Sequence, residues 1–114
     1  METLRIGGVP EHFNMPWQLL LQSPKLSKKG ISASWTDFSA GTGAMIEALN
    51  NDEIDIAMLL TEGAVKGIDN GGRYKIVSFY VDSPLIWGIH IPESSPYRDI
   101  DEIQGKTYAI SRYG

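Results

Sequence analysis

The sequence contains no cysteine among its 114 residues. Disulfide bonds, thiolate nucleophiles and cysteine-ligated metal sites are therefore excluded. The only histidines, His12 and His90, lie in separate segments, so no spacing typical of a metal site occurs. Neither a phosphate-binding P-loop nor a Gly-x-Ser-x-Gly nucleophile motif is present. We therefore expect no metal, no cofactor and no catalytic residue, which favours a binding protein over an enzyme.

Basic residues and long apolar runs are also scarce. The chain has 10 Lys and Arg against 14 Asp and Glu, a net charge of −4, which argues against a nucleic-acid partner. No apolar run approaches the ~20 residues that a membrane-spanning helix needs. The N-terminal residues lack the basic and apolar regions of a signal peptide. We expect a cytoplasmic location for the chain as written, and a periplasmic one if the sequence is a mature form.

Three apolar, strand-like runs each pass through a turn into a helix-like run. The expected strands cover residues 4–9, 31–38 and 54–60, and the expected helices cover 16–22, 42–50 and 63–68. Strands that alternate with helices predict right-handed crossovers and a mostly parallel sheet. In such a sheet, ligands bind outside the carboxyl ends of the strands. The three turns therefore predict a binding edge, although they do not identify the ligand.

Three further β-prone runs follow the alternating region. They cover residues 74–81, 85–91 and 106–110, and a short amphipathic helix around Ile100 and Ile103 is expected before the last of them. The first two runs are long and apolar. Because exposed strand edges invite pairing with another copy, we expect a strand-exchanged or edge-paired homodimer.

The second and third turns supply polar candidates for ligand binding. Gly41, Thr42 and Gly43 would place backbone N–H groups and a hydroxyl at a helix N-terminus, which suits an anion or a polar oxygen. Simple N-capping by Thr42 is the alternative, and the two roles are compatible. Thr61 and Glu62 repeat the arrangement after the third strand. Thr61 is expected to cap the helix that follows, and Glu62 either binds a ligand or interacts favourably with the dipole of that helix.

The first turn contains Glu11, His12 and Phe13. His12 beside Glu11 is suited to titrate near neutral pH or to donate a hydrogen bond to a ligand, and the alternative is an ordinary loop histidine. Phe13, Trp17 and Trp35 either stack on a ligand or belong to the core.

A family resemblance emerges from these segments taken in order. They are Leu4-Arg5-Ile6-Gly7, Pro10-Glu11-His12-Phe13, Ser39-Ala40-Gly41-Thr42-Gly43, residues 51–57, residues 60–63 and residues 103–111. The chain resembles the type II periplasmic binding proteins, particularly the NMT1/THI5-like and sulfonate- or nitrate-type solute-binding branch, and within it a subgroup without secretion signals. The resemblance implies a three-layer α/β lobe with a mostly parallel sheet, Ser39 as a further ligand-binding residue, and a small polar or anionic metabolite as ligand.

Members of that family have two lobes and run to roughly twice this length or more. The resemblance therefore implies a first lobe over residues 1–92, with 93–114 as a hinge region and the first strand of a second lobe where the chain ends. It places Asp82 at the approach to the hinge, where it contacts a ligand or caps a turn. It also places Ser111 and Arg112 in the first loop of the second lobe, where Arg112 is suited to bind a carboxylate or phosphate.

Two other functions remain open under this resemblance. One is a pyrimidine-precursor synthase of thiamine biosynthesis, in which a histidine of the first loop is consumed as a substrate and His12 matches its position. The absence of cysteine departs from that enzyme group, whose cysteine-rich motif this chain lacks. The other is a ligand-sensing regulatory module, which would require a DNA-binding domain that the sequence does not contain.

Overall fold

The computed structural model describes residues 3–110, which divide into two compact units, residues 3–80 and residues 81–110. The first unit is an α/β lobe with three parallel strands. They are β1 (Thr3–Gly8), β2 (Ser32–Asp37) and β3 (Ile56–Ala57), in the order β2-β1-β3. Ile6 of β1 pairs with Trp35 of β2 on one side and with Ile56 of β3 on the other. The alternating strand and helix order and the parallel sheet are as the sequence predicted.

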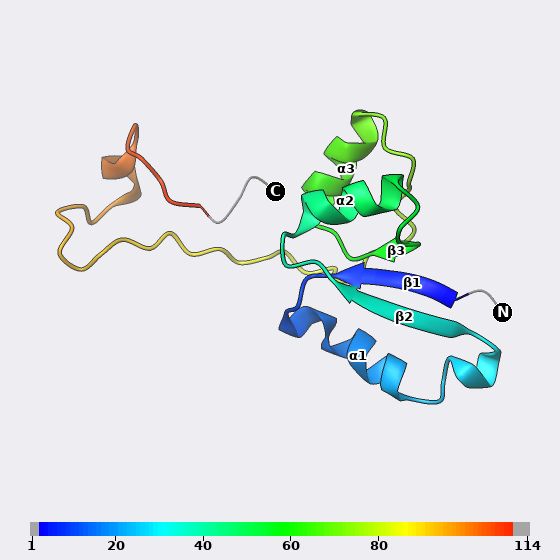
Figure 1. Ribbon diagram of the computed structural model, residues 1–114. Coiled ribbons are helices and arrows are strands. Elements are labelled where there is room, and N and C mark those ends of the chain that lie inside the picture. Colours follow the sequence, from blue (N-terminus) through cyan, green and yellow to red (C-terminus); the bar gives the residue numbers. More distant parts are fainter. Residues whose placement is uncertain (1–2, 111–114) are drawn as a thin grey trace. The chain divides into compact units, whose positions relative to one another are not determined.

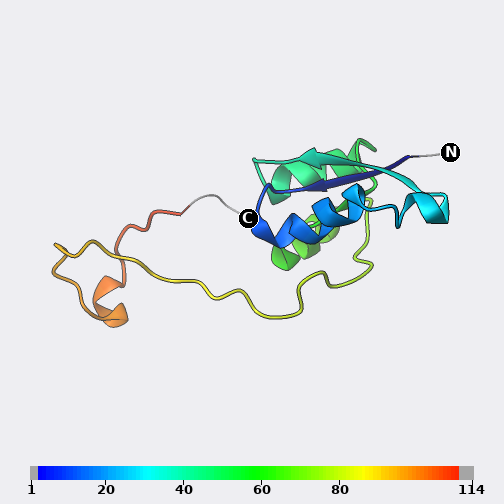
Figure 2. The ribbon, with the colours of Figure 1, turned by 90° about the horizontal axis from the view of Figure 1, so that it is seen from below.

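Helices cover both faces of this sheet. Helix α1 (Met15–Gln22) lies on one face, and helices α2 (Thr42–Asn50) and α3 (Thr61–Asp69) lie on the other, as Figure 1 shows. Figure 2 views the same lobe from the side of α1. Two short 3-10 helices, His12–Asn14 and Ser27–Lys29, flank α1. The lobe therefore has three layers, as expected from the sequence. None of the described helices has the length and apolar character that crossing a membrane requires.

The core of the lobe lies between the sheet and α2. Met45 and Ala48 of α2 and Ile54 before β3 are buried, and half-buried side chains pack around them. Met45 and Ala48 are three positions apart, so they share one helical face, and that face is buried against the sheet. Burial of such side chains contributes about 1.5–3 kcal/mol for each large one. This packing fixes α2 over the sheet and brings its first turn to the carboxyl end of β1.

Two glycines at the end of β1 allow aromatic side chains to approach the strand closely. A Cβ atom at Gly7 would lie 2.7 Å from the Phe38 ring, and one at Gly8 would lie 2.5 Å from the Trp35 ring. Any side chain at either position would displace these rings. The absence of side chains at Gly7 and Gly8 therefore makes room for the rings of Phe38 and Trp35.

The third strand is shorter than the sequence predicted. The apolar run 54–60 forms only a two-residue strand, Ile56–Ala57, which pairs with β1 alone. Within the described residues, β3 pairs with β1 only through Ile56 opposite Ile6 and Ala57 opposite Gly7. The runs 74–81, 85–91 and 106–110 have high β propensity but form no strand, because no described segment pairs with them.

Two predicted caps are also wrong. The N-cap of α2 is Gly41 rather than Thr42, and the N-cap of α3 is Leu60 rather than Thr61, so both threonines are first helical residues. Neither helix has a side-chain cap hydrogen bond. Gly41 has φ 85° and ψ −152°, a combination that is essentially restricted to glycine. The chain therefore enters α2 through backbone freedom, which the capping rule for threonine does not take into account.

The second unit contains one short helix within its described residues, the 3-10 helix Ile100–Ile103, near the amphipathic helix that the sequence predicted. Asp99 and Glu102 form a capping box at its start, and two backbone N–H groups, of Arg98 and Asp99, lower the pKa of Glu102. Ile103 is buried, and its carbonyl accepts a hydrogen bond of 2.8 Å from the Tyr108 hydroxyl. These contacts give the second unit a small local core.

Candidate functional site

Three turns follow the carboxyl ends of the strands and lie at one edge of the sheet. Backbone hydrogen bonds connect the turns after β2 and β3 to the end of β1: Phe38 N–H donates to Gly8 O over 2.9 Å, and Met58 N–H donates to Gly7 O over 3.2 Å. The strands β1 and β2 point to the same side in Figure 1, where both turns emerge. The common edge that the sequence predicted for these turns is therefore present, and ligand binding at this edge stays a prediction.

At this edge, the connections that follow β1 and β3 run to opposite faces of the sheet. The chain leaves β1 toward α1 on one face of the sheet, and it leaves β3 toward α3 on the opposite face (Figure 1). Neighbouring parallel strands whose connections diverge in this way open a crevice at their carboxyl ends, and ligands of open α/β sheets bind there. The turn residues after β1 and β3 border this position.

Most predicted site residues lie in these turns. Glu11, His12 and Phe13 follow β1 and are exposed, and the His12 and Phe13 ring centroids are 4.4 Å apart. The remaining ones of this lobe follow β2 and β3; they are Ser39, Gly41, Thr42, Gly43, Thr61 and Glu62. Asp82 is exposed and belongs to the second unit, and Ser111 and Arg112 lie outside the described residues. Their roles in ligand binding remain predictions.

The start of α2 has the electrostatic character that favours an anion. Its first turn has no acidic residue and no side-chain cap, so the N–H groups of the first turn have no helical or capping acceptor. Thr42 is 4% exposed, which places its side chain against the lobe. By contrast, the first turn of α3 carries Glu62, whose charge opposes an anionic ligand there. The two helix starts are therefore not equivalent.

Two residues near the first turn, Asn14 and Tyr80, were not predicted from the sequence as site residues, and a third, Trp17, was predicted either to stack on a ligand or to belong to the core. The Asn14 amide donates to Val9 O over 2.7 Å, and the Tyr80 hydroxyl donates to Phe13 O over 2.5 Å. The indole nitrogen of Trp17 is buried in the first turn of α1. Burial raises the pKa of Tyr80, so its hydroxyl remains a donor at neutral pH. Asn14 and Tyr80 donate to backbone carbonyls, and Phe13 lies 67 positions from Tyr80 in sequence, so no local pattern marked these two residues.

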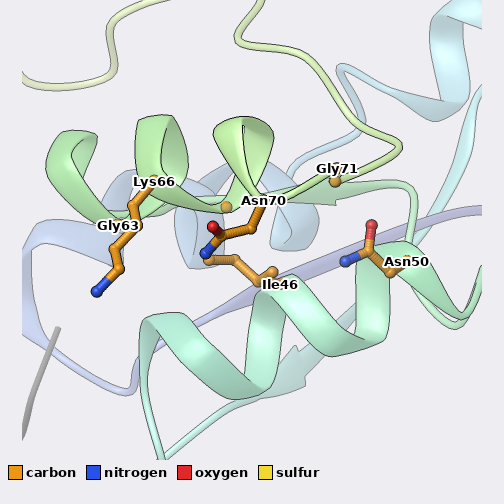
Figure 3. Close-up of a pocket in the computed structure, with 8 residues that line it drawn as sticks. Ile46, Asn50, Gly63, Lys66, Asn70 and Gly71 are labelled. Carbon is orange, nitrogen blue, oxygen red and sulfur yellow. The ribbon is translucent and has the colours of Figure 1, made fainter.

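A second concave surface lies away from the edge, between α2 and α3. Figure 3 shows this groove, which has a volume of about 310 Å³ and is lined by Ile46 and Asn50 of α2 and by Lys66 and Asn70 at α3. Gly63 and Gly67 form its α3 wall. None of the predicted site residues lines this groove. Among residues 3–110, no group of three or more His, Asp or Glu is arranged to hold a metal ion.

Comparison with known proteins supports the fold. No protein-family model and no curated protein matches the chain. One solved structure matches with a TM-score of 0.58 and 32% sequence identity over 62% of this chain: the Candida albicans CA3427 gene product, described as defining a new family of proteins with the generic periplasmic binding protein structural fold. The match covers 23% of that chain, so the region compared is a minor part of the longer protein.

The sheet order, the helices on both faces and this structural match agree on the class of protein. The chain has an α/β fold with an open parallel sheet, the architecture of one lobe of a periplasmic binding protein. At the level of the superfamily, this fold is one of ligand-binding proteins. The chain spans less than a quarter of the solved protein that it resembles.

Proposed function

We propose that this chain is a small-molecule-binding protein of the periplasmic-binding-protein superfamily, and that its ligand binds at the carboxyl edge of the sheet β2-β1-β3. The observation that carries the proposal is the divergence of the connections after β1 and β3, because ligands of open α/β sheets bind at such positions. The match to a solved protein with the periplasmic binding protein fold supports the same role.

The chemistry of the edge favours a polar or anionic metabolite. The first turn of α2 offers backbone N–H donors with no acidic residue among them, and the positive end of the helix dipole lies there. His12 is exposed in the adjoining turn after β1 and adds a donor or a positive charge. These features suit the anions of the sulfonate- and nitrate-type branch, and we place the chain in the NMT1/THI5-like group on the motifs in its sequence.

A single lobe supplies one wall of the cleft that two lobes form in this superfamily. Full binding proteins close two lobes around the ligand, so each lobe makes only part of the contacts. We therefore propose that the 114-residue chain binds its ligand weakly. Isothermal titration calorimetry with inorganic phosphate as the probe should give an affinity in the millimolar range, which corresponds to about −4 kcal/mol.

Two variants distinguish the edge from the groove between α2 and α3. Thr42→Val keeps the side-chain shape but removes a hydroxyl at the start of α2, and Lys66→Ala removes the charged side chain that lines the groove. We expect Thr42→Val to weaken phosphate binding and Lys66→Ala to leave it unchanged. The reverse result would assign the ligand to the groove, and tight binding by the single chain would contradict the one-wall interpretation.

A second candidate function rests on the exposure of His12. Its ring lies 4.4 Å from the Phe13 ring at the binding edge, where a ligand would reach it. In a pyrimidine-precursor synthase this histidine would be consumed, which changes the mass of the chain. Mass spectrometry after incubation with pyridoxal phosphate and iron tests this reaction. An unchanged mass of the peptide that contains His12 would reject it.

A further inference from the structure

The turn that follows β1 is held together by local hydrogen bonds. The Glu11 N–H donates to Val9 O over 2.9 Å, and the side-chain amide of Asn14 donates to the same oxygen over 2.7 Å. The Asn14 backbone N–H donates to Glu11 O over 3.0 Å. Asn14 is 4% exposed, so its side chain fixes the turn from inside the lobe. These three bonds hold Val9, Glu11 and Asn14, and none of them involves Phe13.

The carbonyl of Phe13 is bonded to a residue far away in sequence. A carbonyl near the start of a helix usually accepts from an N–H group three or four positions further on. Three positions after Phe13 stands Pro16, which has no N–H to donate. The Tyr80 hydroxyl donates to Phe13 O instead, over 2.5 Å and across 67 positions of sequence. This bond ties the last residue of the first unit to the turn after β1.

The same bond bears on His12, the neighbour of Phe13. The His12 ring is exposed, and its centroid lies 4.4 Å from that of the Phe13 ring, with 32° between the two planes. Exposed side chains change rotamer within picoseconds to nanoseconds, so the place of the His12 ring depends on the backbone that carries it and on this ring contact. Both are fixed when Phe13 is fixed.

We propose that Tyr80 is a positioning residue of the binding edge, which holds Phe13, and with it the His12 ring, in place for the ligand. This inference rests on the proposed function, in which His12 adds a donor or a positive charge at the edge. A turn that is ordered before the ligand arrives raises the affinity, because binding does not have to order it. Tyr80 as a whole is 43% exposed, so removal of its hydroxyl opens no cavity in the core.

The variants Tyr80→Phe and Tyr74→Phe form a matched pair for the test. Each removes one hydroxyl that donates to a backbone carbonyl: the Tyr80 hydroxyl bonds the first turn, and the Tyr74 hydroxyl bonds Ala64 O of α3 over 2.9 Å. Because both lose one hydrogen bond of the same kind, both should lower the thermal stability of the lobe slightly and to a similar extent. A difference between them at the first turn then depends on where the bond lies.

Nitrogen-15 relaxation of the ligand-free chain measures the order of the first turn. In the unaltered chain and in Tyr74→Phe, the order parameters of the His12 and Phe13 amides should be about 0.85, the value of a rigid backbone. In Tyr80→Phe they should fall below about 0.6, while the Thr42 amide at the start of α2 keeps its value. Unchanged order at His12 and Phe13 in Tyr80→Phe overturns the proposal, and so does an equal loss in Tyr74→Phe.

Titration with inorganic phosphate in a double-mutant cycle tests whether Tyr80 acts through His12. Tyr80→Phe should weaken phosphate binding about threefold when His12 is present and should have no effect in a His12→Ala background. Tyr74→Phe should leave binding unchanged in both backgrounds. Equal weakening by Tyr80→Phe with and without His12 overturns the proposal. An unaltered chain that binds no phosphate contradicts the proposed function instead, and the relaxation measurement, which needs no ligand, then decides whether Tyr80 positions the turn.

Discussion

Arg5 and Asp55 join β1 to the start of β3 through a two-point ion pair. Arg5 Nη2 lies 2.7 Å from Asp55 Oδ1, Arg5 Nε donates to Asp55 Oδ2 over 3.1 Å, and the Arg5 backbone N–H donates to the same Oδ2 over 2.7 Å. These residues are separated by 50 positions in sequence. The pair therefore fixes β3 beside β1, which is the pair of strands that borders the proposed binding position.

This ion pair predicts a loss of stability in acid. The side-chain hydrogen bond from Arg5, and then its backbone N–H, lower the pKa of Asp55 from 3.8 to about 2. A depressed folded-state pKa contributes stability above the unfolded-state value, and the contribution disappears as pH falls from about 4 to about 2. Because both side chains are more than a third exposed, we expect only about 1 kcal/mol at neutral pH.

The measurement compares the unaltered chain with Asp55→Asn by urea unfolding between about pH 7 and about pH 2, the range over which the contribution is lost. The difference in unfolding free energy should be greatest at neutral pH and should shrink toward zero at the acid end. Glu53→Gln, a neighbouring acidic residue outside the Arg5–Asp55 ion pair, serves as the control and should show no such dependence. A difference that is constant across this pH range would contradict the assigned role of Asp55.

The backbone conformation at Gly41 predicts that alanine substitution changes the unfolding free energy differently at Gly41 and at Gly43. Gly41 has φ 85°, whereas Gly43 lies inside α2, where an added Cβ atom would meet no neighbouring atom within 4 Å. We expect Gly41→Ala to lower the unfolding free energy by about 1–3 kcal/mol, because alanine is strained in that conformation. Gly43→Ala should be neutral or stabilising, by up to about 1 kcal/mol. Equal effects in thermal unfolding would contradict this account of the turn.

The close approach of Gly67 and Tyr74 predicts that substitutions at these two positions have non-additive effects on the unfolding free energy. A Cβ atom at Gly67 would collide with the Tyr74 hydroxyl, which donates to Ala64 O over 2.9 Å. Gly67→Ala should therefore displace Tyr74 and destabilise the lobe by about 1–3 kcal/mol. In a Tyr74→Phe background the hydroxyl is absent, so the same substitution should cost less. Urea unfolding of the variants in a double-mutant cycle checks the coupling, and strict additivity would rule it out.

Exposed apolar side chains in residues 74–80 predict self-association. Ile76, Val77 and Phe79 are 48%, 83% and 74% exposed, and no described segment pairs with their backbone. Such a segment favours edge pairing or strand exchange with a second copy. Light scattering at high concentration should give twice the mass of one chain, and Val77→Lys should give a monomer. Val65→Lys, at an exposed valine of α3, is the matched control and should leave the dimer intact; a monomeric unaltered chain would oppose the prediction.

The architecture was predictable because it depends on local patterns. Alternating apolar runs and helical periodicity indicated the strands and helices of the lobe, and the parallel sheet then followed from their order. Gly41 as a cap was missed because threonine is the commoner cap, and the positive φ of a glycine is not visible in sequence. The runs at 74–81 and 85–91 were predicted as strands from propensity, which does not indicate whether a partner strand is present.

The sequence was enough to locate the edge of the candidate site, but it did not identify all of the residues there. The turns after β1, β2 and β3 marked the edge because parallel strands end together. Asn14 and Tyr80 were not identified as site residues, because their importance depends on burial and on hydrogen bonds to backbone carbonyls, as between Tyr80 and Phe13. The groove between α2 and α3 was missed for a similar reason, since it arises from the packing of two helices.

The most direct test of the proposed binding edge is a titration of the isotope-labelled chain with inorganic phosphate, followed by amide chemical shifts. The account predicts that the largest shifts occur at Gly41, Thr42 and Gly43, with smaller shifts at Thr61 and Glu62, because Glu62 opposes an anion at the start of α3. Shifts centred on Lys66 and Asn70 in the groove, or no shifts at phosphate concentrations far above the millimolar range, would contradict it.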